Sequence, residues 1–163
     1  MLRKILLGCG IVSSALYVAT DILAARRFPG YRYTDYSISE EIAEAAPTRR
    51  LWVAVSIPSS LLVAALGAGV WASASERKRR AARVTAAALV GYAASSVAGG
   101  LLFPLPAPSG MPSPEPQGAQ RARQHVLVTA VINVFFLLSM GFGATLLGKR
   151  FRYYRKAHKA AVP

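Results

Sequence analysis

Two groups of polar residues lie at helical spacing within otherwise apolar segments of the sequence. Tyr17 and Asp21 are one helical turn apart, and His125, Thr129 and Asn133 repeat at the same interval. A carboxylate and an imidazole can act as general base and acid, and beside a serine they could support nucleophilic chemistry. Ionisable groups within membrane segments are costly and by default mark a site or a pair. We therefore treat Asp21 and His125 as a candidate pair that lies at one depth in the membrane.

A simpler interpretation of both residues stays open. Asp21 lies near the end of its apolar segment, where it can reach lipid headgroups or pair with Arg26 or Arg27, and His125 can simply cap its helix. With two histidines and one cysteine the sequence has no zinc-type ligand set. It also lacks a phosphate-binding glycine loop, a nucleophile elbow and a metalloprotease motif. We therefore predict no catalytic residue, no metal site and no cofactor.

Four windows of the sequence are almost free of charge, and two of them contain these polar residues. The windows are residues 5–25, 51–75, 82–103 and 125–148. Each has about the 20 residues that a helix needs to cross roughly 30 Å of hydrocarbon. These runs are too long and too uniformly apolar for barrel strands, and lipid admits only helices or closed barrels. We therefore predict an all-α integral membrane protein, a four-helix bundle that forms one domain over residues 1–163.

The distribution of positive charge predicts the orientation of these helices. The amino terminus, the 76–83 link and the tail from residue 149 hold thirteen Lys and Arg residues, against seven in segments 26–50 and 104–124. Because Lys and Arg favour cytoplasmic loops, both termini should be cytoplasmic and the other two segments external. We expect this topology in the cytoplasmic membrane of a bacterium.

The net charge of +13 also raises the question of an anionic partner. The basic tail reads KRFRYYRKAHK and directly follows the last apolar window. Anionic lipid headgroups beside the bilayer explain such a segment, at about 1 kcal/mol for each Lys or Arg near the surface. No nucleic-acid-binding motif accompanies the charge, so we do not expect a nucleic acid partner.

The first external loop predicts a short amphipathic surface helix over residues 38–46. Ser37 and Glu40 match a capping box, and Pro47 ends the run. The apolar residues on one face of this helix are Ile38, Ile42 and Ala45. A helix of about two turns is marginal unless it packs on something, so this face should meet the bundle or the lipid.

This surface helix can be a structural lid, or it can be a gate or partner-facing element, because loops on rigid scaffolds often carry function. Our binding hypothesis includes two residues of this helix, Ser39 and Glu40. Its other members are Tyr17, Asp21, His125, Thr129 and Asn133. The second external loop, residues 104–124, holds six of the ten prolines and reads as an extended linker.

Small residues recur at four-residue spacing on three of the predicted spans. They are Ala65, Gly69 and Ser73, then Ala87, Gly91, Ser95 and Gly99, and finally Ser139 and Gly143. Small residues at this interval let helix backbones approach closely in lipid. The close contacts can form within one chain or between copies, so a homo-oligomer or another membrane partner stays open.

Several stretches together resemble one family of membrane proteins. They are GYRYTDYSISE after the first span, APTRRLWVA opening the second, GYAASSVAGGLLFPL before the second external loop and GFGATLLGKRFRYY after the fourth span. With these motifs the chain resembles the bacterial multi-pass membrane proteins of domain-of-unknown-function family 998. The resemblance covers residues 5–154 and implies a membrane architecture without implying an activity.

Two departures from the family pattern suggest a short, four-helix member. Family members commonly continue with further helices after the stretch that resembles 151–154, whereas this chain becomes basic there. Their second external loop usually carries a polar cluster with an acid ahead of the histidine that resembles His125, whereas this loop is rich in proline.

The sequence therefore favours a non-catalytic membrane protein with an outward-facing polar cleft. The cleft would receive a lipid headgroup, a small ligand or a partner protein. Two other classes stay open: a small transporter or channel subunit, and an enzyme that modifies lipid at the outer leaflet with Asp21 and His125 as acid and base.

Overall fold

The computed structural model describes residues 1–108 and 118–146, which form helices and no strand. The helices are α1 (Leu2–Arg27), α2 (Ile38–Glu41), α3 (Arg49–Ala72), the short 3-10 helix η1 (Glu76–Lys78), α4 (Arg79–Leu102) and α5 (Gly118–Leu146). Four of them are long and apolar enough to cross a membrane. The predicted all-α architecture with four spans is confirmed.

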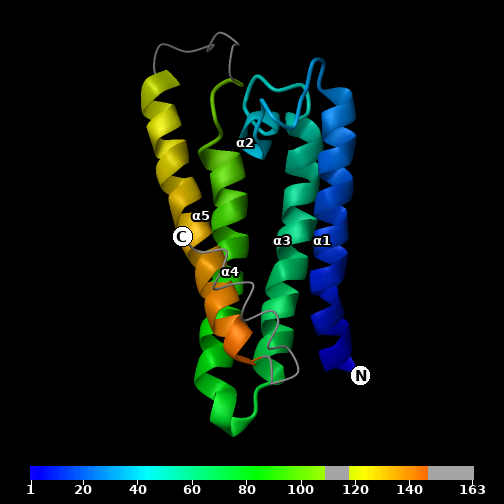
Figure 1. The fold of residues 1–163 in the computed structure, drawn as a ribbon, viewed down its shortest axis with the longest axis vertical. Helices are drawn as coiled ribbons and strands as arrows, with labels where there is room; N and C mark the ends of the chain where they lie inside the picture. The colour runs from blue at the N-terminus through cyan, green and yellow to red at the C-terminus, as the bar shows by residue number, and fades with distance from the viewer. Residues whose placement is uncertain (109–117, 147–163) are drawn as a thin grey trace.

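The four long helices pack side by side in an order that follows the chain. Helix α1 packs against α3, α3 against α4, and α4 against α5 (Figure 1). The short helix α2 lies at one end of this bundle, and the amino terminus lies at the other. Polar residues from α1 and α5 therefore come from the first and last helices of the packing order.

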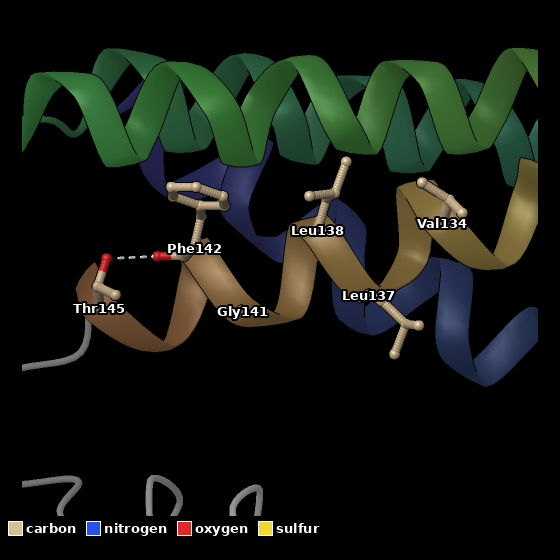
Figure 2. A pocket seen from close by; sticks show the side chains of 6 residues that line it. All are labelled: Val134, Leu137, Leu138, Gly141, Phe142 and Thr145. Carbon is tan, nitrogen blue, oxygen red and sulfur yellow. Dashed lines mark hydrogen bonds between the residues drawn. The ribbon is translucent and has the colours of Figure 1, made fainter. Parts of the chain in front are cut away.

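Most apolar side chains of these helices face outward. In the most apolar window of each span, between 6% (α5) and 28% (the span of α4) of the residues are buried. Helix α5 carries an apolar groove of its own, with Leu137 pointing away from α4 (Figure 2). The residues that line it are Val134, Leu137, Leu138, Gly141, Phe142 and Thr145. Such a surface requires a lipid bilayer as its environment.

Glycines of the predicted small-residue stripes lie where helices approach closely within the chain. A Cβ atom at Gly69 of α3 would lie 2.9 Å from Leu6 Cβ on α1. A Cβ atom at Gly91 of α4 would lie 2.6 Å from a ring carbon of Phe135 on α5. Neither position has room for a side chain unless a neighbour moves, so the stripes serve contacts within the chain.

A serine pair links α1 to α3 inside the bundle. The buried Ser13 hydroxyl donates to the Ser59 carbonyl at 3.2 Å and lies 3.0 Å from the Ser59 hydroxyl. Ser59 directly follows Pro58, which lies inside α3 without ending it. The pair thus adds a polar contact to the packing of α1 on α3, separate from the close approach at Gly69.

We expect Ser13→Ala to destabilise the α1–α3 contact by about 0.6 kcal/mol, the average for a hydrogen bond between membrane helices. Ser14→Ala is the matched control, because the Ser14 hydroxyl donates to Gly10 of its own helix at 2.9 Å. An SDS titration followed by circular dichroism measures both changes. Equal losses in the two variants would contradict a role of the serine pair in holding the helices together.

The predicted surface helix over 38–46 is shorter in the structure. Helix α2 ends at Glu41, although its capping box forms and the Ser37 N–H donates to Glu40 Oε2 at 2.6 Å. The amides of Ile42 and Ala43 still donate back to Ile38 and Glu40, whereas those of Glu44 and Ala45 donate to Leu105 O at 2.8 Å and Pro106 O at 3.3 Å. The helix therefore stops because the second loop supplies the acceptors.

The predicted apolar face of this helix is also not its buried side. Ala45 is exposed and Ile42 half-buried, whereas Glu41 and Ala43 are completely buried. The second loop differs from a bare linker at its start, because Pro104, Pro106 and Pro108 are buried. Residues 109–117 of that loop, and the predicted basic tail, lie outside the described residues.

Candidate functional site

Residues 28–48 and 103–108 together form what we term the loop layer, a folded unit at the α2 end of the bundle. Phe28, Ala43 and Ala46 are its buried centre. Tyr31 and Tyr36 pack against that centre with their rings 5.6 Å apart. Two tyrosines of the first loop thus help to hold the loop layer together.

Glu41 is the most unusual residue of this layer. Its side chain is 0% exposed. Trp52, in the first turn of α3, donates its indole N–H to Glu41 Oε2 at 2.8 Å, and the buried Thr48 hydroxyl donates to the Glu41 carbonyl at 2.7 Å. The other carboxyl oxygen, Oε1, has no hydrogen-bond partner among the described residues. Buried polar atoms are nearly always satisfied, so this oxygen requires an explanation.

Glu41 and Trp52 belong to a group that we term the acid–aromatic cluster: Tyr17, Asp21, Tyr31, Glu41 and Trp52. The rings of Tyr17 and Trp52 meet edge to face, with centroids 5.3 Å apart. The Asp21 carboxylate is close enough to act on Glu41, and the Tyr31 hydroxyl donates a hydrogen bond to the Glu41 carboxyl group. Two acids and three aromatic rings from α1, the first loop and α3 thus converge at one place.

Burial dominates the ionisation of this cluster. Desolvation raises the pKa of Glu41 above its ordinary value, the hydrogen bond from Trp52 opposes that shift, and the charge of Asp21 adds to it. Desolvation and the Glu41 carboxylate raise the pKa of Tyr31 to about 12. Tyr31 therefore keeps its proton at neutral pH, and Glu41 releases its proton less readily than an exposed glutamate.

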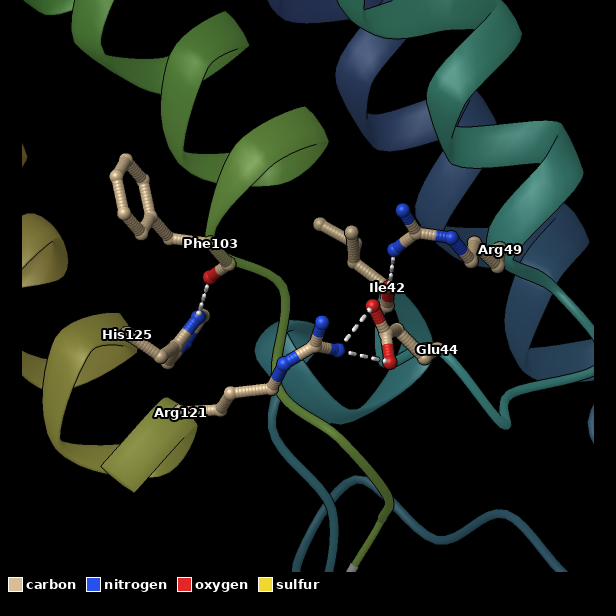
Figure 3. Close-up of polar contacts among 6 residues, drawn as sticks. All are labelled: Ile42, Glu44, Arg49, Phe103, Arg121 and His125. Atoms are coloured by element: carbon tan, nitrogen blue, oxygen red, sulfur yellow. Dashed lines mark hydrogen bonds and ion pairs between the residues drawn. The ribbon is translucent and has the colours of Figure 1, made fainter. Parts of the chain in front are cut away.

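A second polar group lies where α5 meets the loop layer (Figure 3). Arg121 forms an ion pair with Glu44, with nitrogen–oxygen distances of 2.8 and 3.0 Å. The His125 Nδ1–H donates to the Phe103 carbonyl at 2.8 Å, at the end of α4. On the other side of the layer, Arg49 donates to the Ile42 carbonyl at 2.9 Å. These contacts fix the loop layer to α3 and α5.

The structure places the two predicted polar groups, that of Tyr17 and Asp21 and that of His125, Thr129 and Asn133, in different surroundings. Asp21 accepts a side-chain hydrogen bond from Tyr33 and, with Tyr17, belongs to the acid–aromatic cluster. His125 bonds to Phe103, and its Nε2 lies 3.4 Å from the Thr129 hydroxyl. Within residues 1–108 and 118–146, no hydrogen bond or ion pair joins Asp21 to His125. A joint ligand-binding role for the two groups stays a prediction.

The other predicted site residues are spread over three places. Asn133 is exposed, near the middle of α5. Ser39 is half-buried on α2, and Glu40 closes the capping box. Neither α2 residue is a member of the acid–aromatic cluster, and the binding roles of all three stay predictions.

Glu41 and Trp52 are absent from the sequence-based hypothesis. The capping box drew attention to Glu40, and acids in a first helical turn ordinarily face solvent. The available signal was Trp52 itself, because an indole N–H at the start of a span usually finds an acceptor when it is buried. Its acceptor comes from a separate element, so the pairing needed the tertiary structure.

No three side chains of His, Cys, Asp or Glu gather to hold a metal ion in the part of the chain that the structure describes. No curated protein and no solved structure matches the chain significantly. The family model described as protein of unknown function, DUF998, matches residues 11–162, nearly the whole chain. The match confirms the resemblance carried by the loop and span motifs, and the chain belongs to the DUF998 family.

Proposed function

We propose that this protein is a non-catalytic membrane protein that binds a ligand at the acid–aromatic cluster, where the loop layer meets α1 and α3. The observation that carries the proposal is the Glu41 carboxyl group, which is fully buried while Oε1 accepts no hydrogen bond among the described residues. An unsatisfied buried polar atom costs about 1–3 kcal/mol. A bound headgroup, small ligand or partner side chain that reaches Oε1 would offset this cost.

The proposed setting is the cytoplasmic membrane of a bacterium, with the loop layer outside and both termini in the cytoplasm. The unequal distribution of Lys and Arg supports this orientation. At the end of the bundle opposite the loop layer, Arg77, Lys78, Arg79 and Arg80 follow one another in η1 and α4. We propose that these residues and the basic tail bind anionic lipid headgroups.

Self-association, or binding of another membrane protein, is part of the proposal. It would use the exposed side of α5, where Asn133 carries an amide that hydrocarbon cannot hydrogen-bond. Asparagine both donates and accepts, so a second copy of α5 offers a complementary group.

Native mass spectrometry of the gently extracted protein tests ligand binding directly. We expect a retained molecule of defined mass on the wild-type protein and its loss in Glu41→Gln. The matched control is Glu44→Gln, which removes the same charge from the same loop but only breaks a partly exposed ion pair with Arg121. We expect this control to keep the adduct.

An adduct that persists in Glu41→Gln, or a wild-type protein that carries none, would contradict the proposed site. Circular dichroism of each variant shows whether the helical fold is intact. The native mass spectra also report the number of chains in each particle, which tests self-association independently.

A further inference from the structure

We propose, building on this function, that the acid–aromatic cluster recognises an organic ammonium group, the positively charged end of an amine or of an aminoalcohol headgroup. The inference starts from Oε1 of Glu41, which lies in a completely buried residue without a partner within the described structure. A carboxylate oxygen only accepts hydrogen bonds, so the missing group must be a donor.

The charges around Glu41 indicate the sign of the ligand. The described groups that act on its carboxyl group are Trp52, Asp21 and Tyr31, one acid and two neutral aromatic side chains. The nearby guanidinium of Arg49 donates to the Ile42 carbonyl instead. Two acids without a cation among these groups repel each other, and a cationic ligand would remove that repulsion.

The aromatic rings indicate an organic cation. Tyr17 and Trp52 meet edge to face beside the acids, and Tyr31 and Tyr33 do the same, with centroids 5.2 Å apart. Rings attract ammonium groups through their faces, and the ligand's carbon atoms add apolar contact. Calcium would take roughly six to eight oxygen ligands, more than two carboxyl groups supply.

The cluster has an accessible edge and a buried end. Tyr33 is 62% exposed and Tyr17 is 40% exposed, and Asp21 beside them is half-buried. Glu41 lies behind them at 0% exposure. An ammonium group would meet Asp21 first and Glu41 second. The edge lies near the loop-layer end of α1, and because lipid headgroups are expected at the ends of membrane spans, the ammonium can come from a lipid or from a free amine.

Protons should compete with this ligand. Desolvation raises the pKa of Glu41, and an ammonium group binds its ionised form. The groups that face Glu41 are Asp21 and Tyr17 from α1, Tyr31 and Tyr33 from the loop, Thr48 at the N-cap of α3, and Trp52 from α3, with Arg49 directed to the backbone. Affinity should therefore increase as the pH rises above 4.5, the ordinary value for glutamate.

The test uses the full chain in nanodiscs of phosphatidylglycerol. Ethanolamine is titrated in one arm by calorimetry, and in the other arm phosphatidylethanolamine is added to the bilayer and retained lipid is measured by native mass spectrometry. We expect Glu41→Gln and Asp21→Asn each to weaken binding about tenfold or more, the loss of one charge-assisted hydrogen bond. The control Glu44→Gln should bind as the wild type does.

Each outcome decides one point. Binding in both arms, or in the lipid arm alone, supports ammonium recognition and identifies the source of the group. An adduct that depends on Glu41 but is not displaced by either amine would overturn the ammonium inference while the proposed binding function stands. Absence of both the adduct and amine binding would overturn the two proposals together.

Discussion

Replacing Gly69 with leucine is expected to push α1 away from α3 and to destabilise the protein by the upper end of about 1–3 kcal/mol. A Cβ at this position would lie 2.9 Å from Leu6 Cβ and 3.0 Å from the Leu7 backbone nitrogen. Backbone cannot yield as the end of a flexible side chain can, so the helices must separate. An SDS titration followed by circular dichroism measures the loss.

Gly100→Leu is the matched control for this substitution. Gly100 is also a helical glycine, in α4, but a Cβ there would meet nothing within 4 Å. Both changes add the same side chain and the same gain in helix propensity. If Gly100→Leu destabilised the protein as strongly as Gly69→Leu, close approach of α1 and α3 would not be the cause.

Glu41→Ala is expected to destabilise the protein by about 1–3 kcal/mol, because it leaves the buried indole N–H of Trp52 without its acceptor. Glu41→Gln keeps a side-chain oxygen that can accept this bond and should fold normally. Thermal unfolding in detergent, with both variants beside the wild type, measures the difference. Equal stability of the two variants would show that the bond from Trp52 contributes nothing.

The same two proteins, wild type and Glu41→Gln, should differ in their response to pH. The pKa of Glu41 is raised above 4.5, so the folded protein holds this proton at pH values where the unfolded chain has released it. The stability that Glu41 contributes is therefore fully present below pH 4.5 and is lost as pH rises through the raised pKa. Glu41→Gln lacks this group, so the gap between the two proteins should change across that interval.

The membrane spans could be predicted because they depend on composition alone. A long apolar run has few alternatives in lipid, and all four runs form helices. The ends were less accessible to prediction. Helix α5 begins at Gly118, ahead of the predicted residue 125. Its first turns contain Arg121 and Arg123, which are helical, and hydropathy missed these turns because arginine is hydrophilic. Hydropathy marks the segment that lipid surrounds, whereas the helix continues into the loop layer.

The candidate site was predicted in part. Asp21 and Tyr17 stood out because polar residues are rare in such a segment. Glu41 did not stand out, because its burial is produced by Trp52 and the loop layer, and no local pattern encodes a contact between separate elements. The partner of His125 is the backbone carbonyl of Phe103, which no side-chain pattern can reveal.

The bonds from Glu44 and Ala45 to Leu105 and Pro106 impose an order on biosynthesis. The ribosome makes the first loop well before residues 105 and 106, so these backbone amides lack their partners until α4 has been made. Arg121, which pairs with Glu44, is made later still. The loop layer therefore cannot be complete during the insertion of α1 and α3, and its ion pair with α5 forms only when the last helix has been made.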